Sequence, residues 1–165
     1  MRETAWAPAR RADGLLIERP RLAARALAAR GHALISGDLE AAIALLAPGA
    51  PLLGLAALAP EGAHAVRIAR DRALLTTPMP LGAGGGGDGW FATSVDDGWV
   101  AVDIEGEDAP SALAQGTSAD LAAASASAAV LFAGLRCLLL RTDVGFRLHV
   151  EAHRLEALLA WLDGA

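Results

Sequence analysis

Four histidines are the residues of this chain best suited to acid-base or metal chemistry, and they are His32, His64, His149 and His153. His149 and His153 are four residues apart, the separation of two metal ligands on one helix face. The zinc-protease pattern also requires glutamate directly after the first histidine, where this chain has Val150. The pair also straddles a predicted strand-to-helix junction. The sequence therefore predicts a surface pair here and no metal site.

Other reactive side chains lack the neighbours that catalysis requires. Asp96 and Asp97 could form a carboxylate pair, but Gly98 follows them between two predicted strands, which is typical of a turn. No serine lies in a motif that would activate its hydroxyl. The single cysteine, Cys137, lies in an apolar run that predicts a buried, unreactive thiol. We therefore expect no catalytic residue in this chain, and its sequence identifies no cofactor-binding residue.

A glycine-rich stretch, residues 82–89, formally contains the spacing of a dinucleotide-binding loop. That motif requires a strand before it and a helix after it, so that a pyrophosphate can lie on the helix N-terminus. Here residues 78–80 read Pro-Met-Pro, and the residues that follow the glycines lead into a predicted strand. We interpret residues 82–89 as a flexible loop that divides the chain, without nucleotide binding.

Length and charge limit the classes of partner. A chain of 165 residues is predicted to form a single domain over residues 1–165. The net charge is −5 and no basic stripe occurs, which argues against nucleic-acid binding. Three prolines interrupt the apolar residues 41–60, so no membrane helix is expected. One cysteine and the lack of a signal pattern predict a reducing, cytoplasmic location.

The apolar pattern predicts an α+β fold, which we describe in two halves. The first half, residues 14–81, is predicted to contain a helix over 21–30, a strand over 32–36, a helix over 39–46 and a strand pair over 63–68 and 73–77. A Gly-Asp pair before the helix recurs loosely in the second half, which suggests an internal repeat.

The second half, residues 90–165, has the clearer periodicity. Its predicted elements are a strand over 99–104, a helix that Asp108 caps, strands over 138–141 and 146–150, and a closing helix. One core is predicted to contain Val100, Val102, Ile104, Phe146, Leu148, Val150, Leu155, Leu158, Leu159 and Leu162. Alternation along the last strand then places Arg147 and His149 on its opposite face.

Two regions are predicted to contact a partner. Residues 1–13 are predicted to be an irregular N-terminal arm, and half of the 14 arginines lie in residues 1–30. This bias fits either a solvated face or a docking segment, in which Trp6, Arg10 and Arg11 would contact an acidic partner. Trp99 lies on the outward side of its strand, so either another subunit or a helix of the same domain must cover it.

An ordered set of motif residues in residues 90–163 supports a resemblance. The set is Gly106, Asp108, Ala109, Leu113, Gly116, Asp120, Leu121, Phe132, Ala133, Gly134, Leu139, Leu140, Arg141, Asp143, Gly145, Phe146, Leu148, Val150, Leu159, Trp161 and Leu162. It resembles the gamma subunit of heterotetrameric sarcosine oxidases and the similar subunit of N-methylglutamate dehydrogenase. Both are similar to the folate-binding domain of the glycine-cleavage aminomethyltransferase.

The resemblance implies an α+β fold of two β-β-α-β-β-β-α-type halves and a non-catalytic structural subunit of a flavin-dependent sarcosine oxidase. The complex would pass a one-carbon unit to tetrahydrofolate. It implies that large alpha-type and beta-type subunits carry FAD, FMN, NAD and tetrahydrofolate, that a small subunit carries zinc, and that this chain binds none of them. The alternative is a free-standing folate-binding module without catalysis, for which Asp103 is the candidate carboxylate.

Overall fold

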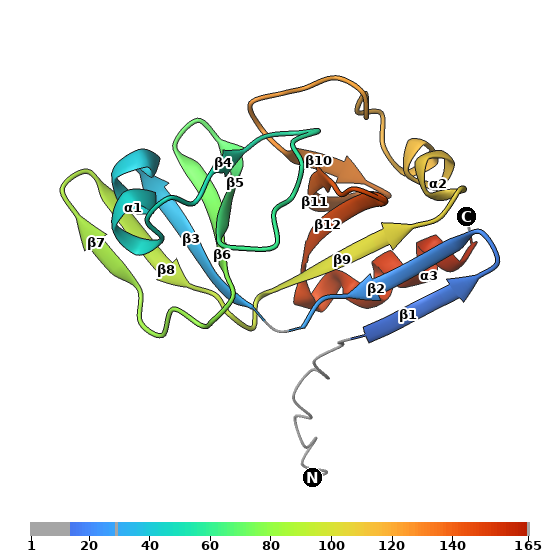
Figure 1. The fold of residues 1–165 in the computed structure, drawn as a ribbon, viewed down its shortest axis with the longest axis horizontal. Helices are drawn as coiled ribbons and strands as arrows, with labels where there is room; N and C mark the ends of the chain where they lie inside the picture. Colours follow the sequence, from blue (N-terminus) through green and yellow to red (C-terminus); the bar gives the residue numbers. More distant parts are fainter. Residues whose placement is uncertain (1–13, 29, 165) are drawn as a thin grey trace, which may run out of the picture.

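The computed structural model describes residues 14–28 and 30–164, which form two six-stranded sheets and three α-helices (Figure 1). The first sheet has the order β1 (Gly14–Arg19), β2 (Leu22–Ala26), β9 (Trp99–Glu105), β12 (Gly145–Glu151), β11 (Leu135–Arg141) and β10 (Ala129–Phe132). The second has the order β4 (Leu52–Leu53), β5 (His64–Ala69), β6 (Arg72–Thr77), β3 (Gly31–Gly37), β8 (Trp90–Ser94) and β7 (Gly85–Gly87). The helices are α1 (Leu39–Leu46), α2 (Ala109–Gly116) and α3 (Leu155–Gly164), and the short 3₁₀ helix η1 (Ala152–Arg154) precedes α3. The predicted α+β class is confirmed.

The two sheets repeat one arrangement of strands. In the first sheet β9 has β12, β11 and β10 on one side and the hairpin β1–β2 on the other. In the second sheet β3 has β6, β5 and β4 on one side and the hairpin β8–β7 on the other. Each hairpin is exchanged, because β1–β2 precedes β3 in the chain but pairs with β9, and β7–β8 precedes β9 but pairs with β3.

This order corrects the predicted halves in detail. The resemblance implied two strands before the helix of each half, whereas β1, β2 and β3 precede α1, and β7, β8 and β9 precede α2. Within the described residues only the second half closes with a helix. Residues 82–89 are not wholly a loop, because Gly85–Gly87 forms β7 and pairs with β8. The side chain of Trp90 lies against this edge, where a Cβ on Gly87 would come within 2.5 Å of the indole nitrogen. The glycines thus allow close packing where the sequence suggested only flexibility.

A glycine with positive φ ends the central strand of each half, as the sequence repeat suggested. Gly37 has φ +99° and Gly106 has φ +110°. The turn of an exchanged hairpin lies against each of these two glycines. A Cβ on Gly37 would be 2.1 Å from the carbonyl oxygen of Gly89 in the β7–β8 turn. A Cβ on Gly106 would be 2.3 Å from the carbonyl oxygen of Arg21 in the β1–β2 turn. The backbone N–H of Asp38 donates to the same Gly89 oxygen at 2.9 Å. Both hairpins are therefore fixed to the neighbouring half through a glycine.

We expect Gly106→Ala to destabilise the protein by more than the roughly 1–3 kcal/mol that an unfavourable backbone angle costs alone, because its Cβ would also collide with the β1–β2 turn. Urea unfolding measures the difference. Gly49→Ala is the matched control, since Gly49 has φ +83° and open space around its Cβ position. Equal losses in the two variants would show that the hairpin does not need the glycine.

The helix caps differ between the halves. The Asp38 carboxylate accepts a hydrogen bond from the Ala41 backbone N–H at 3.0 Å and so caps α1. Asp108 was predicted to cap α2 in the same way, but its side chain makes no capping hydrogen bond. It instead lies 3.2 Å from the Arg21 guanidinium on the β1–β2 turn. An ion pair with the exchanged hairpin has replaced the cap.

The predicted helix over residues 21–30 is wrong. Pro20 and Arg21 form a turn, and β2 follows, with its alternate residues from Leu22 to Ala26 buried. Alanine, leucine and arginine favour helices only weakly, so pairing with β9 and burial of one face outweigh that preference.

The predicted core is confirmed. Eight of its ten residues are buried in one cluster between the first sheet and the helices α2 and α3, and Val100 and Leu159 pack against that cluster. A second cluster lies between α1 and the second sheet. The third cluster contains Val66 and Leu74 of the second sheet and Leu138 and Leu140 of the first, so it joins the two sheets.

We expect Leu158→Ala to cost about 2–5 kcal/mol, because the side chain is fully buried under the first sheet and its loss leaves a cavity. Thermal or urea unfolding gives the value. Leu131→Ala removes an exposed leucine from the same sheet and should cost far less. A Leu158→Ala loss as small as that of the control would place Leu158 outside the core.

Candidate functional site: a buried histidine cluster between the sheets

Four polar side chains from both sheets converge on one buried place. His32 on β3 and His64 on β5 are both register partners of Thr76 on β6, so the three side chains form a row on one face of the second sheet. His149 on β12 approaches this row from the first sheet. Its ring centroid lies 6.4 Å from that of His32 and 6.0 Å from that of His64, with the rings edge to face. We call these four residues the histidine cluster.

Strand alternation explains the position of His149 but not its burial. Phe146, Leu148 and Val150 face the helices, so Arg147 and His149 point the other way, as the sequence predicted. The predicted surface pair is nevertheless wrong, because His149 is fully buried under the second sheet while His153 in η1 is exposed. Spacing within one segment could not show that a second sheet covers this face.

Most polar atoms of the cluster have no hydrogen-bond partner among the described residues. They are Nδ1 and Nε2 of His32, Nε2 of His64, Oγ1 of Thr76, and Nδ1 and Nε2 of His149. The exception is Nδ1 of His64, which lies 2.8 Å from the carbonyl oxygen of Gly62 and therefore carries the proton. Buried polar groups in folded proteins almost always have a hydrogen-bond partner. The cluster is thus an unusual concentration of unsatisfied groups.

The cluster is held in the neutral form. Burial, and after it the neighbouring histidines and the guanidinium groups of Arg147 and Arg30, hold the pKa of His149 well below its ordinary value. Burial also lowers the pKa of His32 and of His64, although Asp96 and the Gly62 carbonyl act in the opposite direction on them. Three neutral imidazoles therefore face one another at pH 7.

A buried ion pair lies beside the cluster. Arg147 donates from Nε to Asp103 Oδ1 at 2.7 Å and from Nη2 to Asp103 Oδ2 at 2.8 Å, and both residues are only 8% exposed. Their strands β12 and β9 pair directly at this position. Arg30 donates to the Glu61 carbonyl at 2.8 Å, and burial together with Arg147 lowers the pKa of Arg30. Asp103, the predicted folate carboxylate, is thus occupied by Arg147.

The other predicted features lie as follows. Residues 96–98 form the predicted turn, and Asp96 Oδ1 accepts a hydrogen bond from the His32 backbone N–H at 2.7 Å. Cys137 is buried as predicted, and burial raises its pKa to about 12, so it stays a thiol. Among the described residues, no group of three or more His, Cys, Asp or Glu is arranged to hold a metal ion.

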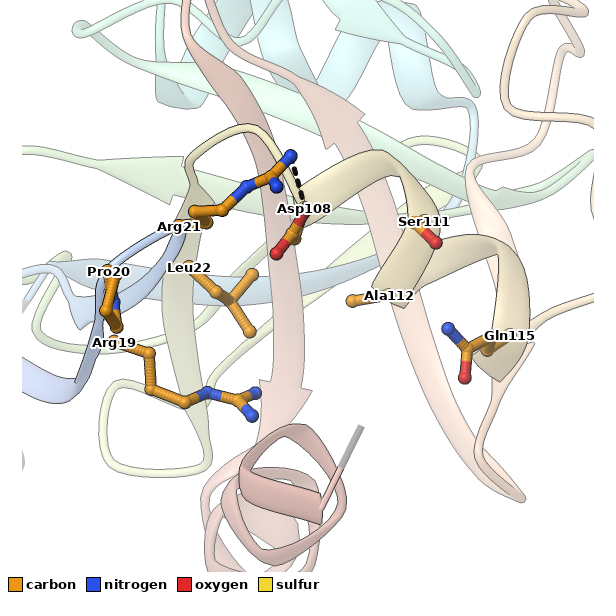
Figure 2. Close-up of a pocket in the computed structure, with 8 residues that line it drawn as sticks. All are labelled: Arg19, Pro20, Arg21, Leu22, Asp108, Ser111, Ala112 and Gln115. Carbon is orange, nitrogen blue, oxygen red and sulfur yellow. Dashed lines mark ion pairs between the residues drawn. The ribbon is translucent and has the colours of Figure 1, made fainter.

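An open pocket of about 520 Å³ lies between the β1–β2 turn and α2 (Figure 2). Its polar groups come from Arg19, Arg21, Asp108, Ser111 and Gln115. Arg21 pairs with Asp108 at 3.2 Å, and Arg19 donates to the backbone carbonyls of Leu162 and Asp163 at the end of α3. The pocket residues include no nucleophile activated by a base, so the pocket has the groups for binding but not for catalysis.

The predicted partner contacts are placed only in part. Trp6, Arg10 and Arg11 lie outside the described residues. Trp99 is half-buried and packs against the apolar cluster that joins the sheets. Sequence reasoning missed the row of His32, Thr76 and His64. The available signal was a histidine at or next to each of two predicted strands, 32–36 and 63–68, but nothing in the sequence showed that both histidines face a second sheet.

Comparison with known proteins identifies a fold and no family. No protein-family model and no curated protein matches this chain. Nine chains of solved structures do match. One of them belongs to a heterotetrameric sarcosine oxidase from Corynebacterium sp. U-96 in complex with pyrrole 2-carboxylate, with a TM-score of 0.69 and 17% sequence identity over 90% of this chain and 85% of that chain. The chain thus has the fold of one subunit of a sarcosine oxidase, and the two chains are of similar length.

In the described part of the chain, every helix is too short or too polar to cross a membrane.

Proposed function

We propose that this chain is the gamma-type, non-catalytic structural subunit of a heterotetrameric, flavin-dependent oxidase that acts on sarcosine or another N-methyl amino acid. The observation that carries the proposal is the shared fold over 90% of this chain with a sarcosine oxidase subunit of similar length. The motif residues between Gly106 and Leu162 support the same assignment independently of the fold. The repeated strand order of the two sheets also suits a relation to the folate-binding domain of aminomethyltransferases.

The arrangement of reactive groups supports a structural role. Three of the four histidines are buried between the sheets, where no substrate reaches them, and the only cysteine is a buried thiol. The open pocket beside α2 has charged groups, but they form ion pairs and backbone contacts within the chain. We therefore assign FAD, FMN, NAD and tetrahydrofolate to large alpha-type and beta-type subunits, and zinc to a small fourth subunit, in a cytoplasmic complex.

The test is isolation of the complex through this chain. The tagged chain, purified from the cells that produce it, should bring with it flavin-containing subunits whose visible absorbance bleaches when sarcosine is added without oxygen. The recombinant chain alone should show neither flavin absorbance nor turnover. Turnover by the isolated chain would refute a structural role, and a purified complex without flavin would refute membership of an oxidase.

A free-standing folate-binding module is the alternative, and the structure gives it less support. Asp103 was its candidate carboxylate, but both oxygens of Asp103 accept hydrogen bonds from Arg147 in a buried pair. A pterin ring would have to displace that arginine, which would leave a buried charge unpaired. Calorimetric titration of tetrahydrofolate into the isolated chain distinguishes the two functions, because a structural subunit should release no heat above that of dilution.

We expect deletion of residues 1–11 to weaken co-purification with the large subunits while the melting temperature of the isolated chain stays nearly unchanged. The described residues from Gly14 onward form two six-stranded sheets and three apolar clusters, so we expect the fold to persist. The deletion removes Trp6, Arg10 and Arg11, whose side chains suit an acidic partner surface. A variant with Arg10 and Arg11 both changed to Ala isolates the charge effect. Unfolding of the deleted chain with assembly unaffected would show that the segment stabilises the domain.

A further inference from the structure

The unsatisfied atoms of the histidine cluster point to a ligand that the side chains share. His149 is fully buried, and in the part of the chain that the structure describes neither of its ring nitrogens has a hydrogen-bond partner. His32 and Thr76 present further unpaired atoms to the same place from the opposite sheet. A neutral imidazole has one donor and one acceptor nitrogen, so a suitable ligand must both donate and accept hydrogen bonds.

The rings are too far apart to satisfy one another. A ring nitrogen lies about 1.2 Å from its ring centroid, so two imidazoles joined by a hydrogen bond have centroids at most about 5.5 Å apart. The observed separations from His149 are 6.4 Å to His32 and 6.0 Å to His64. A third group must therefore lie between the rings if their nitrogens are to be paired.

The same distances distinguish a water molecule from a metal ion. Two imidazole nitrogens bound to tetrahedral zinc at about 2.05 Å would place their centroids about 5.2 Å apart. Two imidazole nitrogens that each lie about 2.8 Å from one shared water, at a near-tetrahedral angle, would place their ring centroids about 6.2–6.5 Å apart. The observed separations of 6.4 and 6.0 Å are close to the water value and exceed the zinc value by roughly an ångström.

The charges around the cluster agree with a neutral ligand. Arg147 and Arg30 oppose positive charge on the histidines, and they would oppose a bound cation in the same way. Asp103 is already paired with Arg147, so it is not available to neutralise a metal ion. Asp96 is engaged by the His32 backbone N–H.

We propose that His32, His64, His149 and Thr76 form a buried water-binding site that joins the two sheets. Water supplies both donors and acceptors, and a buried water commonly has two to four polar partners, as this cluster offers. The site connects β3, β6 and β5 of one half to β12 of the other. It therefore links the two repeated halves through hydrogen bonds at a place where the surrounding interface is apolar.

A crystal structure of the full chain at pH 7, together with metal analysis of the same preparation, tests the proposal. We expect a density peak about 2.6–3.2 Å from ring nitrogens of His149 and of at least one histidine of the second sheet. Transition-metal content should be far below one ion per chain. A peak at about 2.0–2.1 Å with stoichiometric metal would overturn the proposal. Rings that contact one another directly, or a cluster without density between the rings, would overturn it as well.

Solution NMR gives a second, independent measurement. Cross-relaxation between water and the ring protons of His32 and His64 should show a long-lived water in the unmodified protein. His149→Leu should abolish these signals, and His153→Leu, which changes an exposed histidine of η1, should leave them unchanged. If His149→Leu does not fold, Thr76→Val removes one hydroxyl partner and should shorten the residence time of the water. Loss of the signals in His153→Leu, or their absence from the unmodified protein, would contradict the proposed site.

Discussion

Lowering the pH from 7 to 5 is expected to destabilise this protein, because burial between the sheets lowers the pKa of three histidines in the folded state. Their pKa values lie below the unfolded value of about 6.5, so the unfolded chain binds more protons in this range. The stabilisation is complete above about pH 7 and is lost as the pH falls. His149, whose pKa is lowered the most, should contribute the largest part of the loss, and His32 and His64 add to it in the same direction.

Urea unfolding at several pH values between 7 and 5 measures this loss, and most unfolded carboxyl groups stay ionised over that range. The charged groups that face the cluster are Arg30, Arg147, Asp103 and Asp96, and Arg30 and Arg147 reinforce the neutral state of His149. His149→Gln should reduce the slope of stability against pH by about one proton. The same change at exposed His153 is the matched control. A stability that is flat between pH 7 and 5 would show that the cluster is protonated or solvated in the fold.

Replacing Arg147 with leucine is expected to cost about 3–5 kcal/mol, because it leaves the Asp103 carboxylate buried without its partner. Asp103→Leu should cost a similar amount, since it leaves the Arg147 guanidinium buried without its carboxylate partner. The double variant Asp103→Leu/Arg147→Leu should be more stable than either single variant, because no unpaired charge stays buried. Urea unfolding of the four proteins gives the coupling energy.

An exposed ion pair provides the control for this cycle. Arg21 lies 3.2 Å from both Glu107 and Asp108, but these side chains are more than half exposed. Arg21→Ala should therefore cost only about 0–1 kcal/mol. Single variants of the buried pair that lose no more than this control, or a double variant with the sum of the two single losses, would show that Asp103 and Arg147 are solvated in the folded protein.

Local patterns in the sequence determined much of the second half. Period-two alternation over β9 and β12 and the apolar stripe of α3 identified one core, because each pattern depends only on which face of its own element is buried. Asp38 and the Asp96–Gly98 turn were also predictable, since capping and turn chemistry act over a few residues. The order of motif residues after Gly106 indicated a sarcosine oxidase subunit, and the fold of this chain is that of such a subunit.

Tertiary structure alone decided where the hairpins and the histidines lie. Residues 22–26 form β2 because β9 offers a pairing partner. The exchange of β1–β2 with β7–β8 pairs segments more than fifty residues apart, which no local pattern records. Asp108 pairs with Arg21 for the same reason. The sequence predicted His149 to be a surface residue. Strand alternation shows which face of the sheet a side chain lies on, but it does not show whether another sheet covers that face. Burial between two sheets, and with it the neutral state of three histidines, exists only once both sheets have formed.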